Sequence, residues 1–214
     1  ALLLAVNQDI KDELKYRMVE TLLSEGADPN LRSSDGVAPL HVTTMAGNVK
    51  ICELLINAGA DVSLVGKHDK NCLHYAAMSG DIEIAKMIYA AYRKEKKSTI
   101  GPFMNSRALE SGWTPLMYCA NLGHTEIGLF LVEKGADCSI KSNDSEKFDG
   151  ISPYAMAKRS NATLLMHVIS PTAEDIASME IERRVAEQNS ESSLSKRYSV
   201  VGTSKNLQAS DKHL

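Results

Sequence analysis

The side chains most able to do chemistry in this chain are its cysteines and histidines, which can act as nucleophiles, general bases or metal ligands. The four cysteines are Cys52, Cys72, Cys119 and Cys138. They lie far apart, none forms a CxxC pair, and no histidine stands at zinc-finger spacing from any of them. We therefore expect reduced thiols, no metal site and no cofactor. Such thiols are typical of an intracellular protein, cytoplasmic or nuclear.

Catalytic motifs are missing from the sequence. It contains no GxSxG, HExxH, P-loop or GxGxxG pattern. His68 and His124 have no cysteine or aspartate partner at nucleophile or metal spacing. We predict that the chain is not an enzyme and that its function is binding.

Composition limits the classes of protein that fit. The chain has 214 residues, 43% of them apolar, which is enough for one domain, or for a domain and a tail. Its 24 Lys and Arg against 27 Asp and Glu give a net charge of -3, so no overall field favours nucleic acid or an anionic membrane. The longest apolar run, residues 1–6, is far shorter than the roughly 20 residues of a membrane helix. The first residue is not methionine, so we expect a fragment that lacks its native N-terminus.

The elements that must position these residues repeat along the chain. Shifting the sequence by 33 residues aligns residues of the same or similar type. A third copy follows 43 residues further on, at 114–124. The matched segments are the Gly-Ala-Asp triplets at 26–28, 59–61 and 135–137, and the Leu-His pairs at 40–41 and 73–74. Internal periods of this length predict a solenoid of small stacked units.

Each unit is predicted to be a pair of short helices. Helices begin near Pro39 and Pro115, because proline suits the first helical turn. Glycine accepts the left-handed conformation that follows a helix end, and the first helices are predicted to end at Gly47, Gly80 and Gly123. Apolar residues at helical spacing predict second helices over 49–57, 82–89 and 125–133. One such pair cannot enclose a core, so stability must come from stacking neighbours.

The pattern resembles the ankyrin repeat, whose signature is T-P-L-H-x-A-A-x-x-G-H followed by a second amphipathic helix and G-A-D. Three near-complete copies carry the resemblance. It implies an all-α fold, an ankyrin-repeat solenoid of stacked helix-turn-helix units with short β-hairpin loops. We expect this ankyrin-repeat domain over residues 1–170, with irregular first and last units. The expected repeats span 1–32, 33–65, 66–109, 110–141 and 148–170.

The last part of the chain falls outside the repeats. Residues 171–188 read as a short C-terminal helix or cap. Residues 189–214 are rich in serine and poor in large apolar side chains, which is typical of a flexible tail, or of one docked on a partner or in the groove of this chain. Residues 196–199 carry the basic pair before serine that many kinases favour.

The resemblance also assigns roles to side chains. In the family, the histidine of the signature bonds the neighbouring hairpin, which we expect of His41 and His74. Partners bind along a concave face made of hairpin tips and first helices. The residues that the resemblance places on that face are Val42, Met45, Tyr75, Met78, Trp113, Tyr118, Asn121, Leu122, Asp35, His68 and Lys70. The alternative is that the tyrosines and methionines merely pack against adjacent hairpins.

An insertion in the third unit contains the one dense basic cluster of the sequence, Arg93, Lys94, Lys96 and Lys97. Cations in the last turn of a helix complement its dipole, which is one interpretation of the cluster. Contacts with an acidic partner are the other. The insertion at 92–110 itself is either a recognition element or tolerated drift.

We predict a non-catalytic protein–protein interaction module, a scaffold or adaptor that binds a peptide or domain through its concave face. The alternative is a substrate-recruiting or regulatory ankyrin domain of a larger enzyme or signalling protein. A third hypothesis is nucleic-acid binding through the basic insertion at 93–97. Such binding calls for positive charge on neighbouring repeats, and repeat four supplies almost none. Partner identity and oligomeric state stay open.

Overall fold

The computed structural model describes residues 1–95, 99–143, 150–169, 175–177, 180–181 and 183–185. Lys96, Lys97 and the serine-rich tail at 189–214 lie outside these residues. The chain divides into two compact units, Ala1–Ser170 and Pro171–Leu214, which are taken separately below. Among the described residues, no helix combines the length and apolar character that a membrane span requires.

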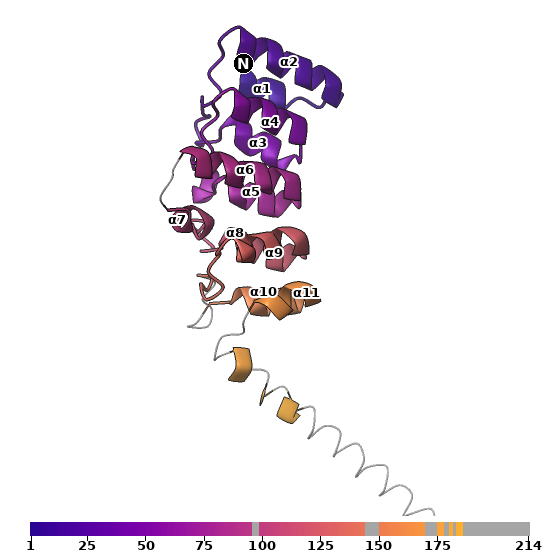
Figure 1. Ribbon diagram of the computed structural model, residues 1–214, viewed down its shortest axis with the longest axis vertical. Helices are drawn as coiled ribbons and strands as arrows, with labels where there is room; N and C mark the ends of the chain where they lie inside the picture. Colours follow the sequence, from indigo (N-terminus) through magenta and orange to yellow (C-terminus); the bar gives the residue numbers. More distant parts are fainter. Residues whose placement is uncertain (96–98, 144–149, 170–174, 178–179, 182, 186–214) are drawn as a thin grey trace, which may run out of the picture. The chain divides into compact units, whose positions relative to one another are not determined.

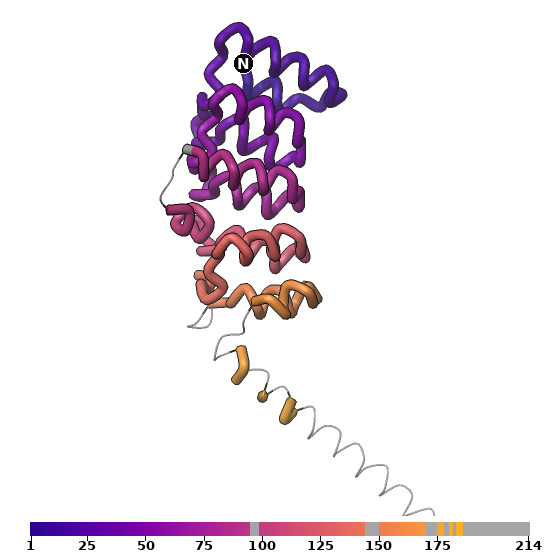
Figure 2. The backbone as a smooth tube through the Cα atoms, viewed as in Figure 1, coloured from indigo at the N-terminus to yellow at the C-terminus, as the bar shows by residue number. Residues whose placement is uncertain are grey.

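The first unit is a stack of antiparallel helix pairs (Figure 1). The first helices of the pairs are α1 (Leu2–Val6), α3 (Pro39–Met45), α5 (Cys72–Ser79), α8 (Pro115–Leu122) and α10 (Pro153–Arg159). The second helices are α2 (Asp12–Ser24), α4 (Val49–Asn57), α6 (Ile82–Glu95), α9 (Thr125–Glu133) and α11 (Thr163–Val168). Each helix packs on its counterpart in the next pair, so the two rows run side by side along the stack (Figure 2). The predicted all-α solenoid of stacked helix pairs is confirmed.

The helix ends follow the local rules that the sequence predicted. Pro39 and Pro115 lie in the first turns of α3 and α8. Gly80 ends α5 with φ of 83°, a left-handed value that glycine adopts without strain. In the last pair, Asn161 takes the corresponding place with φ of 57°, because asparagine tolerates this conformation better than other residues with a side chain.

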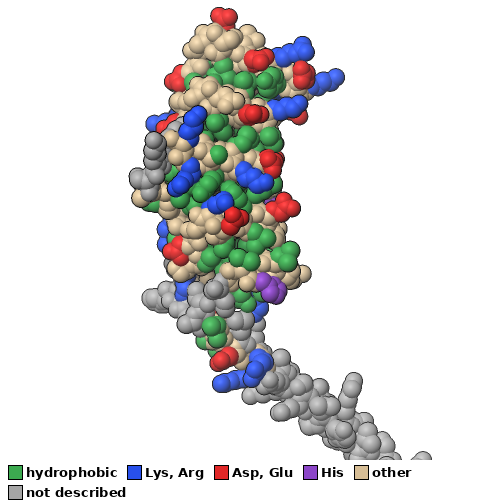
Figure 3. All heavy atoms as spheres, in the orientation of Figure 1, with side chains coloured by type: hydrophobic (Ala, Val, Ile, Leu, Met, Phe, Trp, Pro, Cys, Tyr) green, Lys and Arg blue, Asp and Glu red, His purple; other side chains and the backbone are tan. Residues whose placement is uncertain are grey.

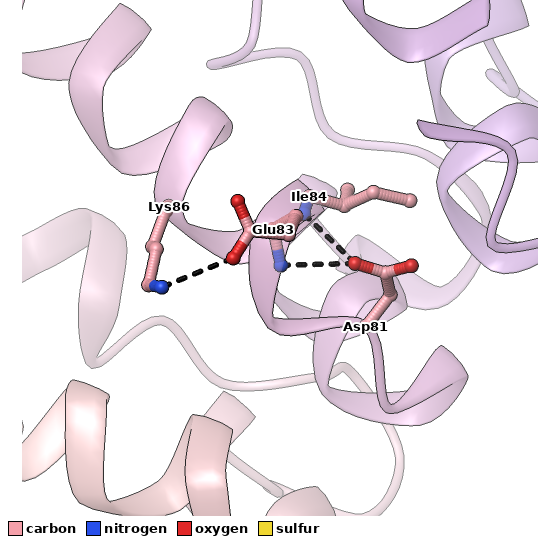
Figure 4. A network of polar contacts seen from close by, with 4 residues as sticks. All are labelled: Asp81, Glu83, Ile84 and Lys86. Atoms are coloured by element: carbon pink, nitrogen blue, oxygen red, sulfur yellow. Dashed lines mark hydrogen bonds and ion pairs between the residues drawn. The ribbon is translucent and has the colours of Figure 1, made fainter. Parts of the chain in front are cut away.

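The start of α6 shows how a second helix is capped. One carboxylate oxygen of Asp81 accepts hydrogen bonds from the backbone N–H groups of Glu83, at 2.9 Å, and Ile84, at 3.1 Å (Figure 4). Glu83 in turn forms an ion pair with Lys86 at 3.1 Å. The two hydrogen bonds to Asp81 satisfy backbone N–H groups that have no partner within the helix.

The core runs through the stack without interruption. Small side chains are buried along the first helices. These are Thr43, Thr44, Ala76, Ala77, Cys119 and Ala120, all of them buried. Along the second helices, the aliphatic residues Ile51, Ile84 and Ile127 are at most 1% exposed. The repeats are therefore held together mainly by apolar burial between neighbours.

The connections between pairs differ from the expected β-hairpins. Among the described residues there is no strand, only an isolated bridge between Val65 and Asn71. The loops are still closed as hairpins are, with Gly66 N–H donating to Lys70 O at 2.8 Å and Ala108 N–H donating to Trp113 O at 2.9 Å. Each arm is too short to form a ladder of the several bonds that define a strand.

Neighbouring loops are tied to one another along the stack. The N–H of Leu109 donates to His68 O at 2.8 Å, and the N–H of Asn143 donates to Ser111 O at 2.7 Å. Arg107 donates to Lys141 O at 2.8 Å and also to the side chain of Asn143. The loops near residues 68, 107–111 and 141–143 are thus linked one to the next.

The insertion in the third unit folds against the stack. It contains a one-turn helix, α7 (Gly101–Met104), in which Phe103 and Met104 are buried. The ring of Phe103 stacks on Tyr92 of the extended α6, with centroids 4.1 Å apart and planes 9° from parallel. Asn71 donates to Phe103 O at 2.8 Å and fixes the insertion to the preceding loop.

In the second unit, residues 175–177, 180–181 and 183–185 are helical. Their large apolar side chains Ile176, Ile181 and Val185 are between 45% and 62% exposed. The prediction that residues 171–188 cap the last repeat stays a prediction.

Candidate partner-binding surface

His41 and His74 perform the structural role that the resemblance implied. The Nδ1 atom of His74 accepts a hydrogen bond from Asn71 N–H at 3.1 Å, and its Nε2 atom lies 3.1 Å from Trp113 O. His41 repeats this arrangement with Ala38 N–H and Leu64 O, both at 3.0 Å. Burial lowers the pKa of both rings, and that of His74 to about 4, so both are neutral at pH 7. Their ring nitrogens already have partners in the fold.

The cysteines are equally unsuited to chemistry. Cys52, Cys72 and Cys119 are fully enclosed, and Cys138 is half-buried. Burial raises the pKa of all four thiols, which therefore remain protonated at pH 7 and are poor nucleophiles. Within the part of the chain that the structure describes, no three His, Cys, Asp or Glu side chains gather as metal ligands.

The residues predicted to contact a partner do lie in columns across the repeats. Equivalent positions of α3, α5 and α8 carry Val42, Tyr75 and Tyr118, and all three side chains are half-buried. The neighbouring positions carry Met45, which is 46% exposed, and Leu122, which is 48% exposed. Met78 is half-buried and Asn121 is exposed. The first helices therefore present a row of apolar side chains that is partly open to solvent.

Sequence reasoning missed one member of this row. Leu4 of α1 is 69% exposed and stands two residues after Leu2, as Val42 stands two residues after Leu40 and Tyr75 two after Leu73. Aligning the three leucines would have identified it, although an insertion before α2 hides the period there. We call the surface formed by residues 4, 42, 45, 75, 78, 118, 121 and 122 the column surface.

The two tyrosines pack partly against the preceding repeat. The Tyr75 ring lies 5.2 Å from that of His41, and the Tyr118 ring lies 5.9 Å from that of His74 in an edge-on arrangement. Tyr118 also meets Trp113, with ring centroids 5.1 Å apart. The contact with Trp113 matches the alternative role, packing against an adjacent loop. Both tyrosines nevertheless remain partly accessible.

The loop residues have separate surroundings. Lys70 is half-buried, with its ammonium 5.3 Å from the centre of the Tyr118 ring, within the range of a cation–π contact. His68 pairs with Glu110 at 3.5 Å, and Asp35 is exposed. Trp113 is half-buried beside Tyr118. Lys70 and Trp113 thus gather around Tyr118 at the edge of the column surface.

The basic cluster is only partly described. Arg93 and Lys94 are exposed in the last turn of α6, where a cation complements the helix dipole. Lys96 and Lys97 lie outside the described residues. On the face drawn in Figure 3, acidic and basic side chains are interspersed, without a broad field of one sign.

Comparison with known proteins agrees with the architecture. A model of ankyrin repeats, in three copies, matches residues 2–100, and a single ankyrin-repeat model matches residues 111–143. A short stretch is also similar to proteins described as NAD-capped RNA hydrolase NUDT12 from Macaca fascicularis, Pongo abelii and Homo sapiens. The identity is 54% over 39 residues, which make up 18% of this chain and 8% of each relative. The match therefore spans less than a tenth of those proteins.

Proposed function

Because the chain belongs to the ankyrin-repeat family, we propose that it is a non-catalytic scaffold or adaptor whose column surface binds a segment of a protein partner. Ankyrin repeats are protein-interaction modules. The described residues offer no activated nucleophile, because the buried thiols are protonated and the rings of His41 and His74 are neutral and bonded. The proposal therefore assigns the chain recognition and no reaction.

The observation that carries the proposal is the row of exposed apolar side chains on the first helices. Leu4, Met45 and Leu122 are 69%, 46% and 48% exposed, although burying each of them would be favourable. They flank Tyr75 and Tyr118, whose rings are already held on one side by the preceding repeat. Aromatic rings fixed in this way lose little entropy on binding, which suits them to be anchors of an interface.

The chemistry of the surface indicates the kind of segment that fits it. The middle of the row is apolar and aromatic, and its edge carries Lys70, Asp35 and the contact of His68 with Glu110. We expect an extended or helical partner segment with apolar anchors toward the first helices and polar residues toward the loops.

The test uses exposed members of the row, because replacing a half-buried tyrosine would also disturb the fold. In a Met45→Glu/Leu122→Glu variant, proteins that co-purify with the unmodified chain from cells should be lost. Leu164→Glu is the matched control, since Leu164 is 67% exposed on α11, away from the column surface. Partners that are retained equally by all three proteins would refute the proposed site, provided that circular dichroism shows all three folded.

A second function has one observation in its favour, the short similarity to proteins described as NAD-capped RNA hydrolase NUDT12. Under this alternative, the ankyrin repeats recruit a substrate or regulate a catalytic domain elsewhere in a longer polypeptide. We expect the chain itself to have no hydrolase activity. The two functions differ in one readout: only under the second does removing the repeats from the longer protein change its turnover of substrate.

A further inference from the structure

The second helix of the first repeat carries an apolar stripe on its surface. Leu14, Met18 and Leu22 stand four residues apart on α2 and so share one face of the helix. Leu14 is 53% exposed and Met18 is 38% exposed, while Leu22 is half-buried. Beside them lies a groove of about 340 Å³ lined by Arg17, Met18, Thr21 and Leu22. We call these three apolar residues the α2 stripe.

The other repeats show what this position normally does. Met18 stands eight residues before the glycine of the first Gly-Ala-Asp, and Ile51 and Ile127 stand eight residues before the glycines of theirs. Ile84 and Leu165 hold the same place in α6 and α11. The exposed fraction is 0% for Ile51, Ile84 and Leu165 and 1% for Ile127. The position is therefore buried in every repeat that has another repeat before it in the chain.

The last repeat shows which neighbour covers the position. A β-carbon added to Gly128 of α9 would lie only 2.8 Å from both terminal carbons of Leu165 on α11. Leu165 thus packs directly on the second helix of the preceding repeat, at a residue that has no side chain. The corresponding residues of α4 and α6 are Cys52 and Ala85, which are also small and completely buried. The last repeat therefore inserts a large aliphatic side chain into a small-residue site on the repeat before it, and α4 and α6 carry small residues at the same place.

We propose that the α2 stripe is the open half of such a repeat–repeat interface, and that its occupant is the second helix of a further ankyrin repeat of the same polypeptide. The stripe continues the contacts that join α2 to α4 and α4 to α6 along the stack. A terminal capping repeat would carry polar residues on this face, because the face would meet water. Met18 instead has the character of an interior residue.

The geometry also distinguishes this occupant from a second copy of the chain. Two copies that meet through their α2 stripes would oppose Met18 to Met18, large side chain against large side chain. The repeat interface is instead head-to-tail, with the large residue of one helix opposite a small residue of the next. The inference does not depend on the function proposed for the column surface.

The test adds a repeat to the full chain. Residues 39–71, one complete period that includes α3, α4 and the following loop, are fused ahead of Ala1, so that Leu2 follows the loop as Leu73 does. Cys52 of the added copy then provides the small-residue site for Met18. We expect the thermal midpoint to rise by at least about 3 °C, and amide hydrogen exchange in α2 to slow by at least about tenfold.

Variants separate the interface from a general effect of the added residues. Met18→Glu should lower the midpoint of the extended chain by about 4 °C or more and that of the original chain by less than about 1 °C. Leu31→Glu, at a side chain that is 61% exposed in a loop, is the matched control and should leave both midpoints within about 1 °C.

Two results would overturn the inference. The first is an extended chain whose α2 amides exchange as fast as before, with Met18→Glu acting equally in both proteins. The second is an original chain that sedimentation velocity shows to be a dimer, and that becomes a monomer with Met18→Glu, since the occupant would then be a second copy. A monomeric original chain together with the midpoint differences above supports the proposal.

Discussion

The Nε2 atom of His74 lies 3.1 Å from the carbonyl oxygen of Trp113, so a buried side chain of the third repeat holds the loop that leads into the fourth. Its Nδ1 atom accepts from Asn71 N–H, which fixes the ring as the neutral form with the proton on Nε2. Protonating Nδ1 would remove that acceptor and place a charge in the core. Burial is accordingly the main reason that the pKa of His74 falls from 6.5 to about 4.

This relationship predicts that stability falls in mild acid. The unfolded chain binds a proton at His74 below pH 6.5, whereas the folded chain does so only near pH 4, so the stabilisation is complete above pH 6.5 and declines as the pH falls toward 4. We expect a loss of about 2 kcal/mol between pH 7.5 and pH 5, to which His41 adds in the same direction. Thermal unfolding across this range measures it. A His74→Gln variant should be less stable at pH 7.5 and show a flatter profile; an equally steep profile would assign the effect to other groups.

Gly80 is predicted to be more sensitive to substitution than another glycine of the same conformation. Both Gly80, with φ of 83°, and Gly59, with φ of 88°, have left-handed backbones. A β-carbon at Gly80 would lie 2.9 Å from the ring of His124, whereas one at Gly59 would meet nothing within 4 Å. Gly59→Ala should cost about 1 kcal/mol and Gly80→Ala about 2–3 kcal/mol, because a clash is added to the backbone strain. Chemical denaturation compares the two, and equal losses would contradict the clash.

Phe103 is predicted to hold the insertion of the third repeat on the stack. It is 6% exposed and stacks on Tyr92, so Phe103→Ala should cost about 3–4 kcal/mol locally. We expect protease cleavage to become faster within residues 95–105, while the other repeats stay protected. Pro102→Ala, at an exposed neighbour, is the control. Unchanged cleavage in the Phe103 variant would show that other contacts carry the insertion.

Asn30 is predicted to brace the first repeat to the second. Its side-chain N–H donates to Gly59 O at 3.0 Å, and its side-chain oxygen accepts from Asp61 N–H at 2.7 Å. Asn30→Ala removes both bonds and should cost about 1–2 kcal/mol. Asn57→Ala, at an exposed residue of α4, should cost less than about 0.5 kcal/mol. The difference is measured by urea unfolding, and similar values for the two variants would rule out the brace.

The sequence by itself determined the fold, because each rule involved is local. Pro39 and Pro115 mark helix starts, Gly80 and Gly123 accept the backbone that ends a helix, and the apolar period fixes which face is buried. Because the unit is repeated, residues of the same type mark helix starts, helix ends and buried faces several times along the chain. The approximate bounds expected at 49–57 and 125–133 therefore match α4 and α9. The expected 82–89 was too short, because α6 continues to Glu95 into the insertion.

Only the tertiary structure decided which side chains are covered, because burial depends on neighbours from other repeats. The tyrosines Tyr75 and Tyr118 turned out to be half-buried against histidines more than thirty residues away in the chain. Met18 has the residue type of an interior position, yet it is 38% exposed, because no described repeat covers that face of α2. Local sequence fixes the shape of each unit, whereas exposure is a property of the stack, and the stack exists only once the units have packed.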